Sequence, residues 1–175
     1  KNCHMLLFYF FFIKLIRIIN IPIIGPILES IVQTFRDEKD QGILTLTHIY
    51  LLVGCSMPIW IFPYFTSHNL AISSGLITIG FGDTAASVFG YLFGKNYWSG
   101  THKTIEGTFC AMIAQFLASL IIYNYLISSI YLITLYELVI IVIACVIIAL
   151  IEAKTTQIDN LTLPLYFYIL TTFLL

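Results

Sequence analysis

The stretch GFGDTAASVFGYLFGKNYWSGTHKTIEG, residues Gly80–Gly107, places one carboxylate, Asp83, inside an otherwise apolar run. A polar loop follows this run and carries three basic side chains and an acid: Lys95, His102, Lys103 and Glu106. Inserting a charged side chain into a membrane-length segment costs roughly 2.5 to 3.5 kcal/mol, so such a residue usually serves function. The stretch therefore predicts a functional site in which the loop supplies positive charge beside Asp83.

The composition places the chain among membrane proteins. Its 175 residues are 59% hydrophobic and 10% charged, and the mean hydropathy is +0.96, far from the values of soluble domains. The net charge of −1 provides no basic surface, so we expect the lipid bilayer and no nucleic acid as a partner. The cysteines stand singly in apolar surroundings, which indicates reduced packing residues.

The apolar runs predict an all-α, polytopic transmembrane helical bundle. A helix crosses about 30 Å of hydrocarbon with about 20 residues. Four runs meet this length, and two weaker ones, at the two ends of the sequence, bring the expected total to about five to six spans: Ile43–Phe65, Leu70–Phe93, Gly107–Ile127 and Leu135–Ile151, then Cys3–Ile24 and Leu161–Leu175. With no linker or repeat, residues 1–175 are predicted to form a single membrane-embedded domain. Because the chain starts at Lys1, we expect it to be a fragment of a longer membrane protein.

The connections between the expected spans differ in charge. Ser67–Asn69 and Ser128–Ser129 are short and uncharged, whereas most charged side chains fall in Glu29–Asp40, Lys95–Glu106 and Glu152–Asp159. Alternating spans put these three charged connections on one side of the membrane. The positive-inside rule predicts that this side is cytosolic.

Small residues recur every fourth position before the loop and predict a face that another helix approaches closely: Gly82, Ala86, Gly90 and Gly94. Ordinary helix packing explains such a stripe equally well. Asp83 and Ser87, four residues apart, add a polar line beside it. Gly80 and Gly82 also allow a break in the helix, which would aim a helix N-terminus at an anion.

The loop itself has the groups that a phosphate site needs. Thr104 could begin the next helix, but Glu106 follows two residues later and not three, so it misses the capping-box spacing. Lys103, Thr104 and Glu106 are therefore predicted to be available to a ligand, with backbone N–H groups beside the glycines and carboxylates that could hold Mg²⁺. No G-x-x-x-x-G-K-[ST] sequence is present. The connection Glu152–Asn160 is rich in ion-binding groups as well, although a solvated turn is the simpler alternative.

Four motifs in order resemble the dolichol kinases, CTP-dependent polyprenol kinases of the endoplasmic reticulum. They are the Asp37–Trp60 region (DEKDQG, LTHIYLL, MPIW), GFGDTAASVFG, WSGTHKTIEGT and EAKTTQIDNLTLPLY. The shorter K-T-x-E-G and D-N patterns also occur in phytol kinases and, more loosely, in phosphatidate cytidylyltransferases. The resemblance covers nearly the whole chain except about its first twenty residues. Family members are longer at the N-terminus, so the resemblance implies that residues 1–175 are a catalytic domain at the C-terminal end of a longer protein.

The resemblance implies transfer of the γ-phosphate of CTP to dolichol, giving dolichyl phosphate for protein glycosylation. It implies a multi-pass protein of the endoplasmic reticulum membrane whose active-site loops face the cytosol. The CTP-binding segment corresponds to Phe93–Thr108, with His102-Lys103 where many members have two lysines. The expected nucleotide-binding residues are Gly94, Lys95, Trp98, Gly100, Thr101, His102, Lys103, Thr104 and Gly107.

We assign roles by charge. Lys103 is expected to bind the CTP phosphates, and Asp83, Glu106 and Asp159 are expected to hold Mg²⁺, or another divalent cation, or to orient the alcohol. Asp83, Lys103 and Glu106 are thus the predicted catalytic residues. Two alternatives stay open: a cytidylyltransferase that transfers CMP, and a transporter in which Asp83 belongs to an ion site.

Overall fold

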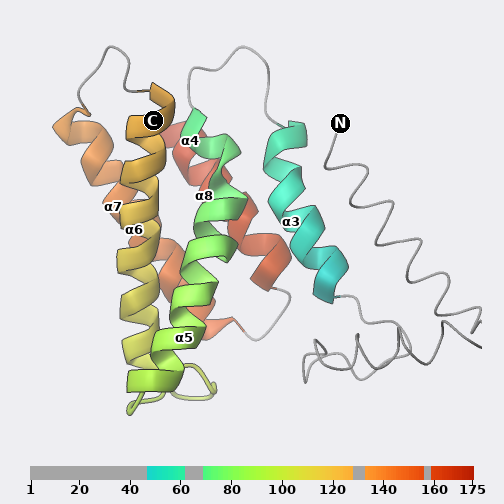
Figure 1. Cartoon of the computed structure of the whole chain (residues 1–175), viewed down its shortest axis with the longest axis vertical. Helices are drawn as coiled ribbons and strands as arrows, with labels where there is room; N and C mark the ends of the chain where they lie inside the picture. Colours follow the sequence, from blue (N-terminus) through green and yellow to red (C-terminus); the bar gives the residue numbers. More distant parts are fainter. Residues whose placement is uncertain (1–46, 62–68, 128–132, 156–158) are drawn as a thin grey trace, which may run out of the picture. The chain divides into compact units, whose positions relative to one another are not determined.

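The structure, a computed structural model, describes residues 47–61, 69–127, 133–155 and 159–175 (Figure 1). These residues form α3 (Thr47–Ile61), α4 (Asn69–Ile72), the π-helix η1 (Leu76–Asp83), α5 (Thr84–Phe93), α6 (Ile105–Ile127), α7 (Leu135–Lys154) and α8 (Asp159–Leu174). Within the described residues there is no strand, only an isolated bridge between Tyr97 and Thr104. The prediction of an all-α fold is confirmed.

Among the residues that the structure describes, three helical stretches are long and apolar enough to cross a membrane: Leu76–Phe93, Ile105–Asn124 and Leu135–Lys154. They correspond to three of the predicted spans, with boundaries shifted by a few residues. The apolar helix Tyr50–Ile61 is shorter, and α8 has 16 residues. The expected span Cys3–Ile24 lies outside the described residues, so the total of five to six stays a prediction.

The chain divides into two compact units, Lys1–Val53 and Gly54–Leu175. Only the beginning of α3 represents the first unit among the described residues. The expectation of one domain therefore stays a prediction, and the account below concerns the second unit.

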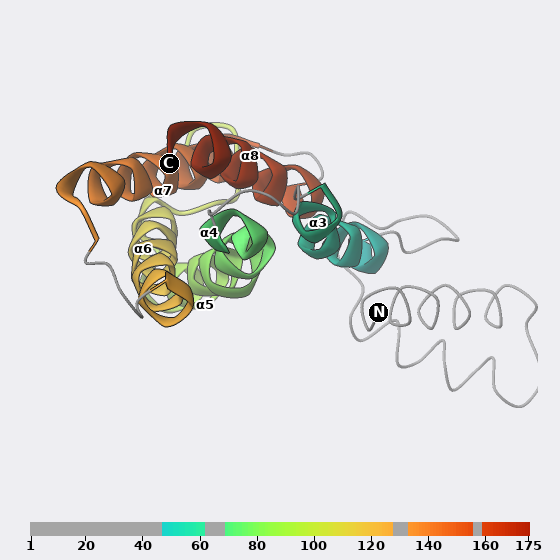
Figure 2. The same ribbon diagram turned by 90° about the horizontal axis from the view of Figure 1, so that it is seen from above.

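Within the second unit, α6 packs against η1, α5 and α7, and α8 packs against α7, η1 and α4. Figure 2 shows α7 and α8 side by side along one flank of α4, α5 and α6. The core between them is apolar, and in a bilayer such side chains hold helices together by van der Waals packing, because lipid tails are as apolar as they are. Its buried members are Leu70, Ile77, Tyr123, Ile141, Ala144, Cys145, Ile148, Leu163 and Phe167.

The segment before α5 is wound as a π-helix over Leu76–Asp83 and continues into α5 with helical dihedral angles at Asp83 and Thr84. The break that Gly80 and Gly82 made possible is therefore not formed. A broken helix would leave backbone groups without partners at membrane depth, whereas a wider helix keeps them bonded. Consequently no helix N-terminus opens at Asp83, and Asp83 itself lies where the π-helix ends.

The predicted stripe of small residues lies against α6. An added Cβ on Gly90 would come within 2.8 Å of Thr104 Oγ1, and one on Gly82 would collide with the Gln115 side chain. From the other side, a Cβ on Gly107 would meet the Ala86 carbonyl oxygen at 2.7 Å and Gly90 Cα at 3.1 Å. The two backbones approach as closely as small residues allow, so the packing role of the stripe is confirmed.

This close approach makes a prediction about Gly107. We expect Gly107→Ala to lower the melting temperature of the purified protein, because its Cβ meets the backbone of Ala86, which cannot move aside without separating two helices. The cost should be on the order of 1 to 3 kcal/mol. Gly80→Ala is the matched control: its nearest neighbour is the end of the flexible Leu76 side chain at 3.0 Å. Equal melting temperatures for the two variants would contradict the packing described.

Candidate active site

The loop between α5 and α6 is a short hairpin. The Trp98 amide donates to the Lys103 carbonyl at 2.9 Å, and the Ile105 amide donates to the Asn96 carbonyl at 2.9 Å. At the tip Gly100 has a φ of 83°, a conformation that glycine adopts without strain. The hairpin fixes the backbone of Lys103 just before α6 begins.

Two residues that the sequence left available to a ligand instead hold this hairpin. Thr104 Oγ1 accepts from the Gly107 amide at 3.2 Å and so caps α6. The Glu106 carboxylate accepts from Asn96 Nδ2 at 2.8 Å and from the Asn96 amide at 3.3 Å. The geometry therefore assigns Glu106 to anchoring the loop onto the first turn of α6.

Lys103 connects this loop to the α7–α8 region. Its Nζ donates to the Glu152 carbonyl oxygen at 2.7 Å and to Asp159 Oδ2 at 3.0 Å. The Lys103 and Asp159 side chains are 30% and 15% exposed. The ammonium is thus partly shielded from water and fixed in position. These contacts join two of the three charged connections, as the alternation of spans predicted, whereas the third, Glu29–Asp40, lies outside the described residues.

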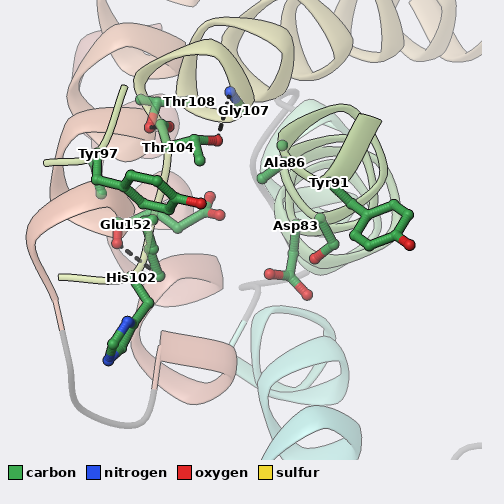
Figure 3. A pocket seen from close by; sticks show the side chains of 13 residues that line it. Asp83, Ala86, Tyr91, Tyr97, His102, Thr104, Gly107, Thr108 and Glu152 are labelled. Carbon is green, nitrogen blue, oxygen red and sulfur yellow. Dashed lines mark hydrogen bonds between the residues drawn. The ribbon is translucent and has the colours of Figure 1, made fainter. Parts of the chain in front are cut away.

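A cavity of about 310 Å³ opens beside Lys103. Figure 3 shows Asp83 and Tyr91 on one side of it, with Tyr97, His102 and Glu152 on the other. Its walls come from η1, α5, the hairpin, α6 and α7. The lining residues are Asp83, Ala86, Ser87, Gly90, Tyr91, Tyr97, His102, Lys103, Thr104, Gly107, Thr108, Glu152 and Ala153.

Glu152 is a charged lining residue that the sequence pointed to only as part of the Glu152–Asn160 connection, without a role of its own. The sequence placed Glu152 in a connection, but α7 continues to Lys154. Glu152 is therefore part of the last turn of this helix, where its side chain is buried, with 3% of the residue's surface exposed. Its Oε2 is buried and makes no hydrogen bond within the described part of the chain. An acid directly after a long apolar run was the available signal, since charged residues at such places are usually functional.

The structure divides the predicted site residues into two groups. Asp83, His102, Lys103, Thr104 and Gly107 line the cavity. The others lie outside its lining: Gly94, Lys95, Trp98, Gly100, Thr101, Glu106 and Asp159. Several of these shape the hairpin, as when Trp98 Nε1 donates to Thr108 Oγ1 at 3.0 Å.

The three acids predicted to hold a divalent cation are not gathered at one point. Glu106 binds Asn96 and Asp159 binds Lys103, and no group of three or more metal-binding side chains occurs within the described ranges. Magnesium sites in phosphoryl-transfer enzymes need only one or two carboxylates, with phosphates and water as the other ligands. Asp83 lines the cavity and supplies carboxylate oxygens, the donor type that such a cation binds. The oxygen donors present fit a divalent cation of this kind.

Comparison with known proteins shows that the chain is similar in sequence to proteins named dolichol kinase. It is 40% identical to the Mus musculus dolichol kinase over 171 residues, which is 92% of this chain and 31% of that protein. It is 34% identical to dolichol kinase EVAN of Arabidopsis thaliana over 159 residues and 31% identical to the Saccharomyces cerevisiae dolichol kinase over 163 residues. No family model and no solved structure matches the sequence.

The alignments cover between 89% and 94% of the chain. They reach relatives from mammals, a plant and yeasts. The chain spans about a third of the length of these curated relatives. The chain is therefore a homologue of the C-terminal portion of dolichol kinases.

Proposed function

We propose that this chain is the catalytic membrane portion of a dolichol kinase, which transfers the γ-phosphate of CTP to the hydroxyl of dolichol. The observation that carries the proposal is the convergence of Lys103, Asp83 and Glu152 on one cavity at the polar end of the helices. The similarity to dolichol kinases supplies the substrate class. The product would be dolichyl phosphate, the carrier used in protein glycosylation.

Lys103 is positioned to receive the phosphates of the nucleotide. Phosphoryl transfer depends mainly on positioning and on neutralising charge, and an ammonium held in a partly buried site does both. The bonds from Lys103 to Asp159 and to the Glu152 carbonyl restrict its side chain before the nucleotide arrives. Asp159 is then a positioning residue that acts through Lys103.

Asp83 is the residue best placed to hold a divalent cation. A divalent cation held there would offset the negative charge of the nucleotide phosphates. Asp83 lies at the end of η1, and Ser87 follows on the same face of α5 and also lines the cavity. The cavity thus lies between the polar hairpin and the apolar helices, where a hydroxyl that arrives from the lipid side meets the nucleotide.

Transfer of specifically labelled phosphate tests the proposal. The full-length protein in membranes, given dolichol and CTP, should place label from the γ-phosphate on the lipid and none from the α-phosphate. A cytidylyltransferase with the same cavity would place the α-label on the lipid and release pyrophosphate. A transporter would turn over no CTP at all. Parallel reactions with ATP establish whether CTP is the preferred donor.

We further propose that the protein lies in the endoplasmic reticulum membrane with the hairpin facing the cytosol. Single cysteines at Ser99, exposed in the hairpin, and at Leu135, 79% exposed at the opposite end of the bundle, should react from opposite sides of sealed microsomes in a cysteine-free background. A membrane-impermeant maleimide should label Ser99→Cys without detergent and Leu135→Cys only after permeabilisation. Labelling of both sites from outside would contradict the orientation.

A further inference from the structure

Glu152 is the carboxylate in the cavity for which the contacts above provide no function. It is 3% exposed in the last turn of α7, and its Oε2 makes no hydrogen bond to any residue that the structure describes. Lys103 binds the backbone carbonyl of Glu152, and its ion pair is with Asp159. The carboxylate therefore faces the cavity without a direct bond to the neighbouring ammonium.

Burying a carboxylate in this way is costly. The penalty for removing an ion from water is several kcal/mol in real proteins, and hydrogen bonds must repay it. Replacing such a group with a neutral isostere usually leaves stability unchanged or improves it, because the desolvation penalty disappears. A group that costs stability and lines a ligand cavity is expected to act on the ligand.

The geometry points to Glu152 as the proton acceptor for the lipid hydroxyl, an inference that rests on the proposed kinase function. Of the ligands that the reaction brings to the cavity, phosphate oxygens are repelled by a carboxylate, whereas an alcohol O–H donates to it. A cation held by Glu152 would lie close to the Lys103 ammonium, whose Nζ is 2.7 Å from the Glu152 carbonyl oxygen, and the two positive charges would repel each other. Of these ligands, the hydroxyl is therefore the one that suits the Glu152 carboxylate, which lines the cavity.

The step balances as follows. The dolichol oxygen forms a bond to the γ-phosphorus while the bond between that phosphorus and the β,γ-bridging oxygen breaks. The hydroxyl proton passes to the Glu152 carboxylate, and CDP leaves with the electron pair of the broken bond. Glu152 then returns the proton to solvent through the open mouth of the cavity. A positioned base of this kind accelerates transfer by about 10²- to 10⁴-fold.

The test compares Glu152→Gln with a matched variant of the same helix, Glu137→Gln. Glu137 lies in the first turn of α7, where it forms a capping box with Thr134, and glutamine preserves that arrangement. In the full-length protein we expect Glu152→Gln to lower kcat at least about 100-fold, with the KM for CTP and the half-saturating Mg²⁺ concentration within twofold of wild type. Glu137→Gln should match wild type. The melting temperature of Glu152→Gln should be equal to or above that of wild type.

A second substrate separates proton transfer from a structural effect. A dolichol analogue with two fluorine atoms on the saturated carbon next to the carbinol has a more acidic hydroxyl and needs a base less. With this analogue the deficit of Glu152→Gln relative to wild type should shrink at least tenfold. A deficit of the same size with both alcohols, or a large shift in the Mg²⁺ requirement, would overturn the assignment.

The inference and the function on which it rests fail in different ways. If wild-type protein transfers no γ-phosphate to dolichol, the proposed function is wrong and Glu152 has no alcohol to deprotonate. If wild type transfers phosphate and Glu152→Gln does so at the same rate, the kinase function stands and the inference about Glu152 is wrong.

Discussion

Replacing Lys103 with alanine is expected to lower kcat/KM for the nucleotide at least about 100-fold, the effect of removing one preorganised donor from a transition state. The loss has two sources. The phosphates lose a fixed positive charge, and Asp159 loses the partner that lies 3.0 Å from its Oδ2, so its negative charge repels the nucleotide. Steady-state kinetics with CTP and dolichol measure the change.

Two further variants show whether the effect of Lys103→Ala depends on the charge and on the position of the side chain. Lys103→Arg keeps the charge but not the compact geometry, so it should retain part of the activity. Lys154→Ala removes an exposed cation two residues after Glu152 that does not line the cavity, and should behave as wild type. If Lys103→Ala bound and used CTP normally, the loop would be only a connector between helices.

The second large effect is expected at Asp83. Asp83→Asn keeps the size and hydrogen-bonding capacity of the side chain but removes its charge, so a residue that only joins helices would tolerate it. We expect normal accumulation in the membrane and a loss of activity of at least about 100-fold, which is roughly 2.7 kcal/mol of barrier. The half-saturating concentration of Mg²⁺ should rise as well, because a cation ligand is lost.

The control for Asp83 is its neighbour. Thr84 is exposed and does not line the cavity, so Thr84→Val tests whether any polar change at the junction of η1 and α5 is harmful. Near-normal dolichol phosphorylation by Asp83→Asn would refute its role and leave Lys103 and Glu152 as the groups that act on the substrates.

The helices were predictable because their signals are local. Long apolar runs and small residues at every fourth position are read directly from the chain, and the structure places Gly90 and Gly107 where that spacing predicts close contact. The place of Asp83 was indicated because a charge within apolar sequence is costly, and that of Lys103 because it lies in a glycine-flanked polar loop with groups that bind phosphate. Both line the cavity.

The contacts that sequence reasoning missed depend on distant partners. Glu106 fails the capping-box spacing with Thr104, yet it binds Asn96, ten residues earlier, because the hairpin brings Asn96 back to the start of α6. No local pattern indicates that pairing. The burial of Glu152 likewise depends on how far α7 continues and on Lys103, 49 residues away in sequence.

The cavity also has a consequence for how the protein becomes active during synthesis. Its walls are made in chain order, with Asp83 first, Lys103 next and Glu152 later, and Asp159, which holds Lys103, follows at the start of α8. A nascent chain whose translation stops after α6 contains Asp83 and the loop. It lacks the Glu152 carboxylate and the ion pair between Lys103 and Asp159. On the proposed function, we expect activity only once the ribosome has released α7 and α8 into the membrane, and nonsense mutations before Glu152 should abolish it even where the earlier spans insert normally.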